Sequence, residues 1–481
     1  MHVQAHRFKE LAKKAIKDSR LQQNLRQIGE TFRARREQAF SEVKDPEALK
    51  ERARKLKERA IARLPLLLEE LETKVKRAGG HVHWARDARE ANALIIAIAE
   101  EAQVRSVVKG KSMVTEEIGL NTALQKHGIE VWETDLGEFI IQLAGEPPSH
   151  IIGPALHKNK EEIARLFSEK LGIPYTDDPR ELTMAARRAL RERFLKAGMG
   201  ITGANMAVAQ TGSVVVVENE GNIRFCSTIP RIHVSVMGIE KVVESLDDMA
   251  ILLDVLPRSA SGQRLSVYTS ILTGPRRSNE LDGPEEFHLI LLDNKRTEII
   301  RDPELRQILY CVRCGACLNV CPVYLKAGGH SYGWVYSGPM GSVLSALLLP
   351  DRLGRELPFA STLCGACRDV CPVKIDLPRL LMILRQRLAE EKGPEAGISF
   401  VQGLVSAAGC KVMARPTLYQ FLSCALRPPS KALHLLDERG IPGLGHIIPW
   451  ARCRNFPELK DPFSTKWPEL KKELAKEVER P

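Results

Sequence analysis

Short apolar runs alternate with amphipathic stretches between about residues 79 and 294. Several of these runs are apolar throughout, which favours strands that are covered on both faces. The predicted strands are residues 104–108, 129–132, 151–152, 213–217, 232–236, 267–272 and 289–292. The predicted helices between them include residues 88–103, 116–127, 159–171 and 179–197. This order predicts an α/β domain over residues 78–298 with a mainly parallel sheet.

The first 77 residues follow a helical pattern instead. Apolar positions recur every three or four residues at Phe8, Leu11 and Ala15 and again at Leu49, Ala53, Leu56, Ala60 and Leu64. Asp45 followed by Pro46 is a helix start signal. The segment carries 21 Lys and Arg against 12 Asp and Glu, which is +9 of the chain's formal charge of +11. Because acidic residues are interspersed and no nucleic-acid motif accompanies them, we predict a basic helical arm whose solvated face docks a partner protein.

Two cysteine runs follow the α/β region. The first contains Cys311, Cys314, Cys317 and Cys321 and the second contains Cys364, Cys367 and Cys371, each run being followed by proline. The spacing C-x2-C-x2-C-x3-C-P is the one by which bacterial ferredoxins hold a cubane iron–sulfur cluster. Structural zinc usually takes two separated C-x2-C pairs, and thiols in the cytosol stay reduced, so zinc and disulfides are weaker interpretations. The runs predict two iron–sulfur clusters, both of the 4Fe–4S type, in an electron-transfer protein.

In ferredoxins of this spacing the fourth cysteine of each run binds the other cluster. Cluster 1 is therefore predicted to take Cys311, Cys314, Cys317 and Cys371, and cluster 2 to take Cys321, Cys364 and Cys367. Cluster 2 is one ligand short, because Ser361 stands three residues before Cys364. Three interpretations stay open: Ser361 as an alkoxide ligand, a distant cysteine (Cys410, Cys424 or Cys453), or a three-iron cluster. Iron prefers thiolate to hydroxyl, which makes serine the weakest of the three. Cys226, Cys410, Cys424 and Cys453 lie outside the runs, and each is expected to be a small buried hydrophobic residue more often than a ligand.

The 42 residues that separate the cysteine runs, 322–363, are more than a compact β-type ferredoxin needs. Residues 342–349 and 377–391 have helical patterns, so we predict a helical ferredoxin-like domain over residues 299–393 and a helical C-terminal region over residues 394–481. His330 is expected to lie in the core or to support a cluster, with a ligand role as the alternative. No apolar stretch approaches 18 residues and the chain opens without an apolar signal segment. We therefore expect a cytoplasmic protein with no membrane span.

One predicted strand, residues 213–217, runs directly into a polar turn. Ligands of parallel α/β sheets bind beyond the carboxyl ends of strands. This turn is thus a candidate small-molecule pocket, with Glu218, Asn219, Glu220, Asn222 and Arg224 as its binding residues. Glycine turns at residues 110–112 and 200–205 are weaker candidates, and for all three turns ordinary loop chemistry is the alternative.

Four motifs, TDLGE at 134–138, HIIGPA at 150–155, ITGAN at 201–205 and NEGN at 219–222, resemble the LUD domain of bacterial lactate-utilisation proteins. Together with the cysteine runs, nearly the whole chain resembles the LutB-type iron–sulfur proteins of this family. The resemblance implies a NagB/RpiA/CoA-transferase-like LUD domain, a helical ferredoxin module and work beside two partner subunits in oxidising L-lactate to pyruvate. The chain departs from the family at Ser361, where some relatives have cysteine, and at Gln210, where many relatives have an acidic residue.

The predicted function is an electron relay within a lactate-oxidising complex, with no catalytic residue, electron acceptor or nucleic-acid partner indicated. An alternative makes the LUD domain a small-molecule-binding or acyl-transfer protein, with clusters that are structural or redox-sensing. A third possibility is a regulatory module that acts through the basic arm. Fold class alone does not choose among these functions.

Overall fold

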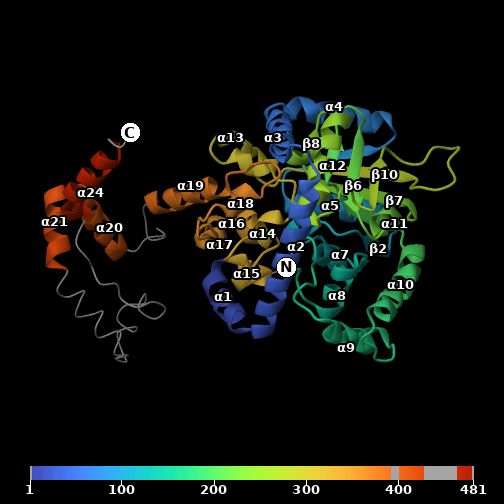
Figure 1. Ribbon diagram of the computed structural model, residues 1–481. Coiled ribbons are helices and arrows are strands. Elements are labelled where there is room, and N and C mark those ends of the chain that lie inside the picture. Colours follow the sequence, from blue (N-terminus) through green and yellow to red (C-terminus); the bar gives the residue numbers. More distant parts are fainter. Residues whose placement is uncertain (1–2, 392–399, 427–462, 479–481) are drawn as a thin grey trace. The chain divides into compact units, whose positions relative to one another are not determined.

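The computed structural model describes residues 3–391, 400–426 and 463–478. The chain divides into two compact units, Met1–Leu388 and Ala389–Pro481, and Figure 1 labels the elements of both. None of the helices in these described ranges is long and apolar enough to cross a lipid bilayer.

A six-stranded sheet in the first unit has the order β1-β10-β7-β4-β2-β3, and every neighbouring pair runs parallel. Its strands are β1 (His81–Ala85), β10 (Glu286–Leu292), β7 (Ile232–Gly238), β4 (Met199–Gly203), β2 (Ser106–Lys109) and β3 (Glu130–Glu133). All seven residues of β7 are buried, including the polar His233 and Ser235, as expected of a strand that is covered on both faces. The predicted parallel α/β sheet is confirmed. The edge strand β1 was not predicted, because three of its five residues are His or Trp.

A smaller sheet takes two of the predicted strands. Its order is β8 (Val242–Val243), β5 (Met206–Val208), β6 (Ser213–Glu218) and β9 (Tyr268–Leu272). Strand β6 pairs antiparallel with both β5 and β9, whereas β5 and β8 are parallel. The predicted strand at residues 151–152 is wrong, since Ile151 and Ile152 lie in a bend. Their apolar side chains pack in the core without belonging to a sheet.

Helices lie between the strands of the two sheets and after the last strand (Figure 1). They are α5 (Ala88–Glu101), α6 (Met113–Glu117), α7 (Leu120–Lys126), α8 (Leu136–Ala144), α9 (Lys160–Leu171), α10 (Pro179–Lys196), α11 (Asn222–Thr228), η2 (Ile239–Lys241), α12 (Leu246–Ala260) and α13 (Arg296–Arg301). The predicted helix 116–127 is interrupted at Gly119, whose φ of +65° no regular helix contains. Helix α9 begins at a capping box formed by Asn159 and Glu162.

The N-terminal arm is helical, as predicted, and comprises η1 (Ala5–Arg7), α1 (Phe8–Lys17), α2 (Ser19–Ser41), α3 (Pro46–Ala62) and α4 (Leu64–Arg77). Asp45 caps α3 by accepting a hydrogen bond from the N–H of Ala48. The predicted apolar face is buried within the chain itself, with Leu56 only 2% exposed. Helix α3 packs against α12, and α2 packs against the cysteine-bearing part. The arm therefore uses its apolar side for folding, and only its polar side is available to a partner.

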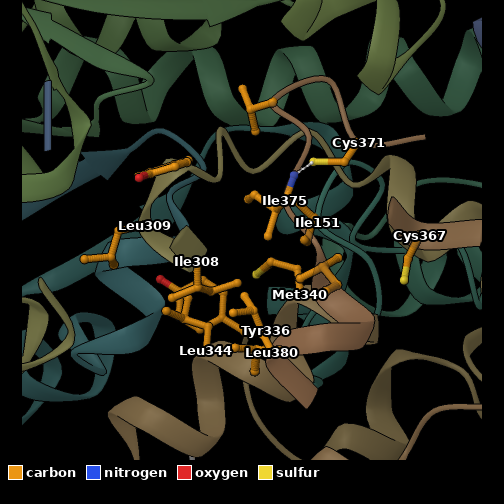
Figure 2. Close-up of a cluster of buried hydrophobic side chains, with 14 of the residues drawn as sticks. Ile151, Ile308, Leu309, Tyr336, Met340, Leu344, Cys367, Cys371, Ile375 and Leu380 are labelled. Carbon is orange, nitrogen blue, oxygen red and sulfur yellow. Dashed lines mark hydrogen bonds between the residues drawn. The ribbon is translucent and has the colours of Figure 1, made fainter. Parts of the chain in front are cut away.

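The cysteine-bearing part is built from short helices. These are η3 (Arg306–Tyr310), α14 (Ala316–Asn319), α15 (Tyr324–Ala327), η4 (Gly329–Tyr332), α16 (Gly338–Leu348), α17 (Asp351–Gly354), η5 (Leu357–Phe359), α18 (Ala366–Asp369) and α19 (Leu377–Glu390). One hydrophobic cluster includes Leu25 of the arm, Val255 of α12 and Leu344 of α16. Figure 2 shows part of this cluster around Met340, Tyr336 and Leu380. The arm, the α/β region and the cysteine-bearing part thus share one core.

In the second unit the described helices are α20 (Phe400–Met413), α21 (Pro416–Ala425) and α24 (Phe463–Val478). Helices α20 and α21 pack against each other. Cys410 lies on α20 and Cys424 on α21, and both are exposed. Cys453, the third distant candidate ligand, lies outside the described residues.

Candidate functional site

The two cysteine runs fold into loops with the same backbone conformation. In the first, Arg313 and Gly315 flank Cys314 with φ of +59° and +76°, and in the second, Leu363 and Gly365 flank Cys364 with φ of +57° and +89°. A one-turn helix follows each loop, α14 in the first and α18 in the second. Left-handed arginine and leucine are strained, and such strain is typical of functional sites. The repeated conformation makes the two runs structural equivalents.

Four thiols from both runs line one small cavity. Cys311, Cys314 and Cys317 come from the first run and Cys371 comes from the second. The rest of the lining is almost entirely apolar, and Figure 2 shows Met340 and Ile375 beside Cys371. These are the four residues that the crossover spacing assigns to cluster 1. Whether they bind a cluster stays a prediction, to be tested by metal analysis.

Backbone N–H groups point at the sulfur atoms of cysteines predicted to bind cluster 1 and of Cys321, which is predicted to bind cluster 2. The N–H of Arg313 donates to Cys311 Sγ over 3.4 Å, and that of Ile375 donates to Cys371 Sγ over 3.3 Å (Figure 2). The N–H of Tyr324 donates to Cys321 Sγ over 3.5 Å. Such donors stabilise anionic sulfur and are among the means by which proteins set the potential of iron–sulfur clusters.

The second group comprises Cys321, Cys364 and Cys367. Burial raises the pKa of Cys367 to about 12, and the neighbouring charges of Cys321 and Cys364 act in the same direction. Cys367 in turn contributes to the raised pKa of Cys317, after burial and the charges of Cys311 and Cys314. Helix α14 of the first loop and helix α18 of the second also pack against each other, so the second group lies next to the first. Cys364 is its exposed member.

The chemistry of these thiols fits a metal cluster. Burial raises the pKa of Cys314 to about 12 and that of Cys371 to about 11, so the thiols on their own stay protonated. Iron binds cysteine in its thiolate form, and the positive charge of the iron stabilises thiolates that burial alone would keep protonated. Within the described ranges, no three His, Cys, Asp or Glu side chains converge as the ligands of one metal ion do. In a cubane each thiolate binds a different iron, so four cysteines spread around a cavity suit a cluster.

Guanidinium groups flank the cavity that the four cysteines line. Arg36 of α2 donates to the carbonyl oxygen of Val370 over 2.8 Å. Burial lowers the pKa of Arg36, and the charges of Cys314 and Cys371 act in the opposite direction. The guanidinium of Arg313 lies 5.1 Å from the ring centre of Tyr336. Burial works against its charge, and Cys311 acts most strongly to keep the pKa of Arg313 raised.

A buried ion network joins the α/β region to the cysteine-bearing part. Arg296, only 1% exposed, donates to both carboxylate oxygens of Glu117 over 2.9 Å and to Glu240 Oε2 over 2.6 Å. The hydroxyl of Tyr336 also donates to Glu117. Glu240 Oε1 lies 3.5 Å from Arg313 Nη2. The network therefore extends from the sheet to the loop that carries Cys311 and Cys314.

The polar turn after β6 faces a cavity of about 290 Å³. Four of the five predicted residues line this cavity, namely Glu218, Asn219, Glu220 and Asn222. Lys111 and Ser112 from the turn at 110–112 line it as well, as do Gly203, the last residue of β4, and Ala204 and Asn205 after it. The turn predicted at 200–205 is therefore a strand up to Gly203. The fifth predicted residue, Arg224, instead lines a separate surface cavity with Arg231 and Arg276. Arg224 lies on α11 and does not line the cavity at the polar turn, whereas Glu220 lines both cavities.

Two other expectations from the sequence also change. His330 is exposed and hydrogen-bonds the carbonyl oxygen of Pro147 over 2.9 Å, so it is not a core residue. Gln210 lies beside Arg59, Arg63 and Glu244 in another surface hollow, apart from the polar turn. Cys226 is fully buried, as expected, with its sulfur 3.4 Å from Thr134 Oγ1.

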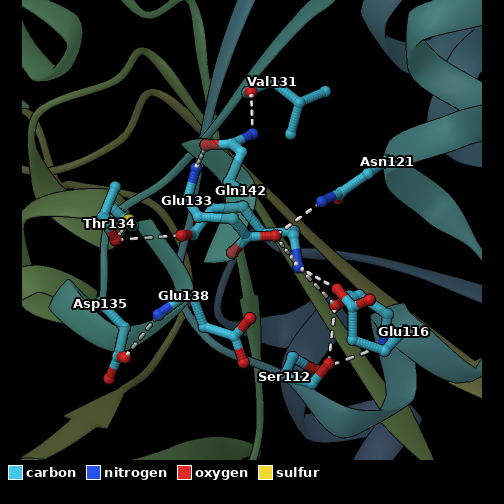
Figure 3. A network of polar contacts seen from close by, with 12 residues as sticks. Ser112, Glu116, Asn121, Val131, Glu133, Thr134, Asp135, Glu138 and Gln142 are labelled. Atoms are coloured by element: carbon cyan, nitrogen blue, oxygen red, sulfur yellow. Dashed lines mark hydrogen bonds and ion pairs between the residues drawn. The ribbon is translucent and has the colours of Figure 1, made fainter. Parts of the chain in front are cut away.

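A buried polar network at the ends of β2 and β3 was not predicted. Lys109 Nζ lies 2.9 Å from Glu116 Oε1 and 2.8 Å from Glu133 Oε1. Figure 3 shows Glu116, Glu133 and Glu138 in this network, with Asn121 donating to Glu133 over 2.6 Å. Burial raises the pKa of Glu138 well above its ordinary range, and Glu133 raises it further. A lysine and a glutamate at the carboxyl ends of adjacent strands, Lys109 and Glu133, were the available signal.

Family comparisons agree with this arrangement. Residues 68–292 match the family model described as LUD domain, and residues 307–375 match the 4Fe-4S dicluster domain. Lactate utilization protein B of Bacillus licheniformis is 43% identical over 462 residues, which cover 95% of both chains. The Bacillus subtilis protein of the same name is 43% identical over 458 residues, again 95% of both chains. The chain belongs to the lactate utilization protein B family.

Family membership bears on several predictions from the sequence. The resemblance and the LUD and ferredoxin-like fold classes are confirmed for this lactate utilization protein B family member, and the match to the 4Fe-4S dicluster domain supports the iron–sulfur prediction. The number of clusters and the cysteines that bind them stay predictions. The relative from Macrococcus caseolyticus is 41% identical and covers 97% of this chain and 98% of its own. A solved DUF162 family structure from Deinococcus radiodurans matches 48% of this chain with a TM-score of 0.28 and 14% identity, too little to support an argument.

Proposed function

We propose that this chain is the iron–sulfur electron-transfer subunit of a multi-subunit system that oxidises L-lactate to pyruvate. The names of its relatives support the pathway, and the observation that carries the role is the pair of adjacent cysteine groups. Oxidation of L-lactate to pyruvate releases two protons and two electrons. A 4Fe–4S cluster takes up and passes on one electron at a time, so two adjacent sites suit this reaction.

Each group of residues has a role in this proposal. Cys311, Cys314, Cys317 and Cys371 would hold the first cluster, and Cys321, Cys364 and Cys367 the second. The N–H groups of Arg313, Tyr324 and Ile375 hydrogen-bond sulfur, and the apolar lining excludes water from the first site. Arg36 and Arg313 place positive charge beside the first group, which favours uptake of an electron there.

Two partner subunits complete the proposed system, which would work in the cytoplasm. The polar side of the N-terminal arm is the surface we assign to partner contact. It is basic and exposed at residues such as Lys13, Lys14 and Lys17. The electron acceptor has no residue assigned to it.

The test uses the complex assembled with its native partners and purified without oxygen. Cys314→Ala should abolish lactate-dependent reduction of an acceptor and remove one cluster from the EPR spectrum. Cys226→Ala, a buried cysteine of the LUD domain outside both groups, is the matched control and should leave both readouts unchanged. Undiminished reduction by the Cys314→Ala complex would refute the relay.

A second function is favoured by the cavity at the polar turn. There the LUD domain would bind or acylate a small molecule, and the clusters would be structural or redox-sensing. The described residues that line this cavity include no cysteine or histidine, so a thiol nucleophile or an imidazole base is not at hand. A redox titration separates the two functions. Clusters that cycle reversibly with lactate and pyruvate present support the relay, and clusters that stay inert support the alternative.

A further inference from the structure

Two cationic side chains, Arg313 and Lys241, line the 290 Å³ cavity, and each has a donor group without a hydrogen-bond partner within the described ranges. The side chain of Arg313 is 7% exposed, and its Nη1 is buried with no hydrogen-bond partner among the described residues. Lys241, at the end of η2, forms no hydrogen bond or ion pair through its ammonium group in the described part of the chain. Lys241 is half-buried, whereas Arg313 Nη1 is a buried donor, and a buried donor without a partner is rare in folded proteins and calls for an explanation.

The carboxylates of the same cavity are already used by the protein. Glu218 accepts hydrogen bonds from the N–H groups of Ile223 and Arg224 over 2.7 and 2.8 Å. Glu220 accepts from the N–H of Leu136 over 3.0 Å, and Asp135 accepts from the N–H of Glu138 over 3.2 Å. Among the groups of the cavity that have no partner in the described part of the chain, two are donors that carry positive charge, Arg313 Nη1 and the ammonium group of Lys241. A ligand that satisfies these donors is an anion.

Arg313 also belongs to the first cysteine loop. It stands between Cys311 and Cys314, and its backbone N–H donates to Cys311 Sγ over 3.4 Å. Its side chain reaches the cavity wall, which it shares with Lys241 of the α/β region. One residue thus contacts both the LUD cavity and the predicted first cluster site.

We propose that this cavity binds a small carboxylate, a 2-hydroxy or 2-oxo acid, with its carboxylate against Arg313 and Lys241. The size of the cavity suits a small ligand, because pockets for larger ligands extend to about 1,000 Å³. Val217 and Leu256 offer apolar wall for the carbon body of the acid. The choice of acid rests on the proposed function, whereas the anion site rests on two donor groups without partners in the residues that the structure describes, Arg313 Nη1 and the ammonium group of Lys241.

Binding at this site is coupled to the charge of the first cluster site. An anion beside Arg313 offsets the positive charge next to Cys311, so adding an electron there becomes less favourable. Coupling of two equilibria is reciprocal, and reduction must weaken anion binding by the same factor. A tenfold preference for the oxidised protein corresponds to a potential lower by about 59 mV for a one-electron centre.

The experiment is calorimetric titration of the full chain, purified without oxygen and loaded with iron and sulfide. L-Lactate and pyruvate are the ligands, and lactamide, which lacks the charge, is the control ligand. We expect both acids to bind the oxidised protein and lactamide to fail. Lys241→Gln should weaken binding at least tenfold. Lys170→Gln, an exposed lysine on α9, should leave binding unchanged.

The redox readout uses the same protein. Saturating pyruvate should lower the midpoint potential of the first cluster, and Arg313→Gln should abolish this shift. Arg313→Gln can also disturb the cysteine loop. If the Arg313→Gln protein loses its first cluster, the binding result for Lys241→Gln decides whether the anion site exists. Absence of binding, or binding that Lys241→Gln does not weaken, would overturn the site. If the complex reduces its acceptor with lactate but the chain binds neither acid, the proposed relay stands and the anion site is refuted. If the chain binds the acids but the complex shows no lactate-dependent reduction, the anion site stands and the relay is refuted.

Discussion

Ser361 occupies in the second cysteine loop the position that Cys311 occupies in the first. The N–H of Leu363 donates to Ser361 Oγ over 3.1 Å, and the N–H of Arg313 donates to Cys311 Sγ over 3.4 Å. In both loops the donating residue is left-handed and precedes a cysteine. Ser361 therefore lies where the repeat would place the fourth ligand of the second site.

Ser361→Cys should supply the missing thiolate. Because iron prefers thiolate to hydroxyl, we expect the second cluster to resist loss of iron to a chelator several-fold longer than in the parent. Iron and sulfide analysis with EPR under timed chelator exposure measures this. Equal rates of iron loss from the parent and the Ser361→Cys protein would contradict the placement.

Ser361→Ala is the matched variant at the same position. If the serine oxygen is a ligand of the second cluster, its removal changes the EPR signal of that cluster. Identical EPR spectra of the parent and the Ser361→Ala protein would remove serine from consideration as the fourth ligand.

Arg36 links the arm to the first cluster site. Arg36→Met removes a positive charge that acts on Cys314 and Cys371, so the extra electron there loses a favourable interaction. The midpoint potential of the first cluster should fall by an amount on the order of tens of millivolts, where about 59 mV is a tenfold change for one electron. Arg33→Met, an exposed position on the same helix, should leave the potential unchanged in the same redox titration. Equal shifts in both variants would contradict a local effect.

Arg296 holds two carboxylates in the core. Arg296→Met leaves Glu117 and Glu240 buried without their main cation, so the free energy of unfolding should drop by about 3–5 kcal/mol. Thermal unfolding under anaerobic conditions measures the loss, and Arg301→Met on the exposed side of α13 serves as control. A change no larger than that of the control would show that the network does not stabilise the fold.

The same network predicts a pH dependence. Burial opposes ionisation of Glu240, but Arg296 and Arg313 hold its pKa down at about 2. A carboxyl whose pKa is depressed in the folded state stabilises the protein above its unfolded pKa of about 4.3, and this contribution is lost as the pH falls toward about 2. Arg296→Met should therefore be less sensitive than the parent to acid between about pH 4.5 and pH 2. Parallel unfolding curves for the two proteins over that range would contradict the assignment.

Glu138 predicts the opposite dependence. Burial raises its pKa, so the folded state retains a proton that the unfolded chain releases above about pH 4.3. This costs stability as the pH rises, and Glu138→Gln should escape that cost. Its melting temperature relative to the parent should increase between about pH 5 and pH 8, by about 1 °C for each kcal/mol relieved, because the unfolding entropy of so large a unit is high. Glu101→Gln, exposed on α5, should show no such trend.

Much of the fold was predictable from local patterns. Uninterrupted apolar runs indicated the buried parallel strands, and the three-to-four spacing of Leu49, Ala53 and Leu56 indicated a helix. The failures have local causes as well. Ile151 and Ile152 are apolar because they pack in the core from a bend, and a short apolar run does not distinguish such a bend from a strand. The break at Gly119 depends on a single positive φ.

By itself, the sequence determined the chemistry of the cysteine runs, because ligand spacing along a short loop is a local property. Only the tertiary structure decided that the apolar face of the arm covers the chain's own core, that Arg224 leaves the polar turn's cavity and that Arg313 reaches it. These outcomes depend on contacts between residues far apart in the chain. Such contacts follow from how whole surfaces pack together, and no local pattern of residues encodes them.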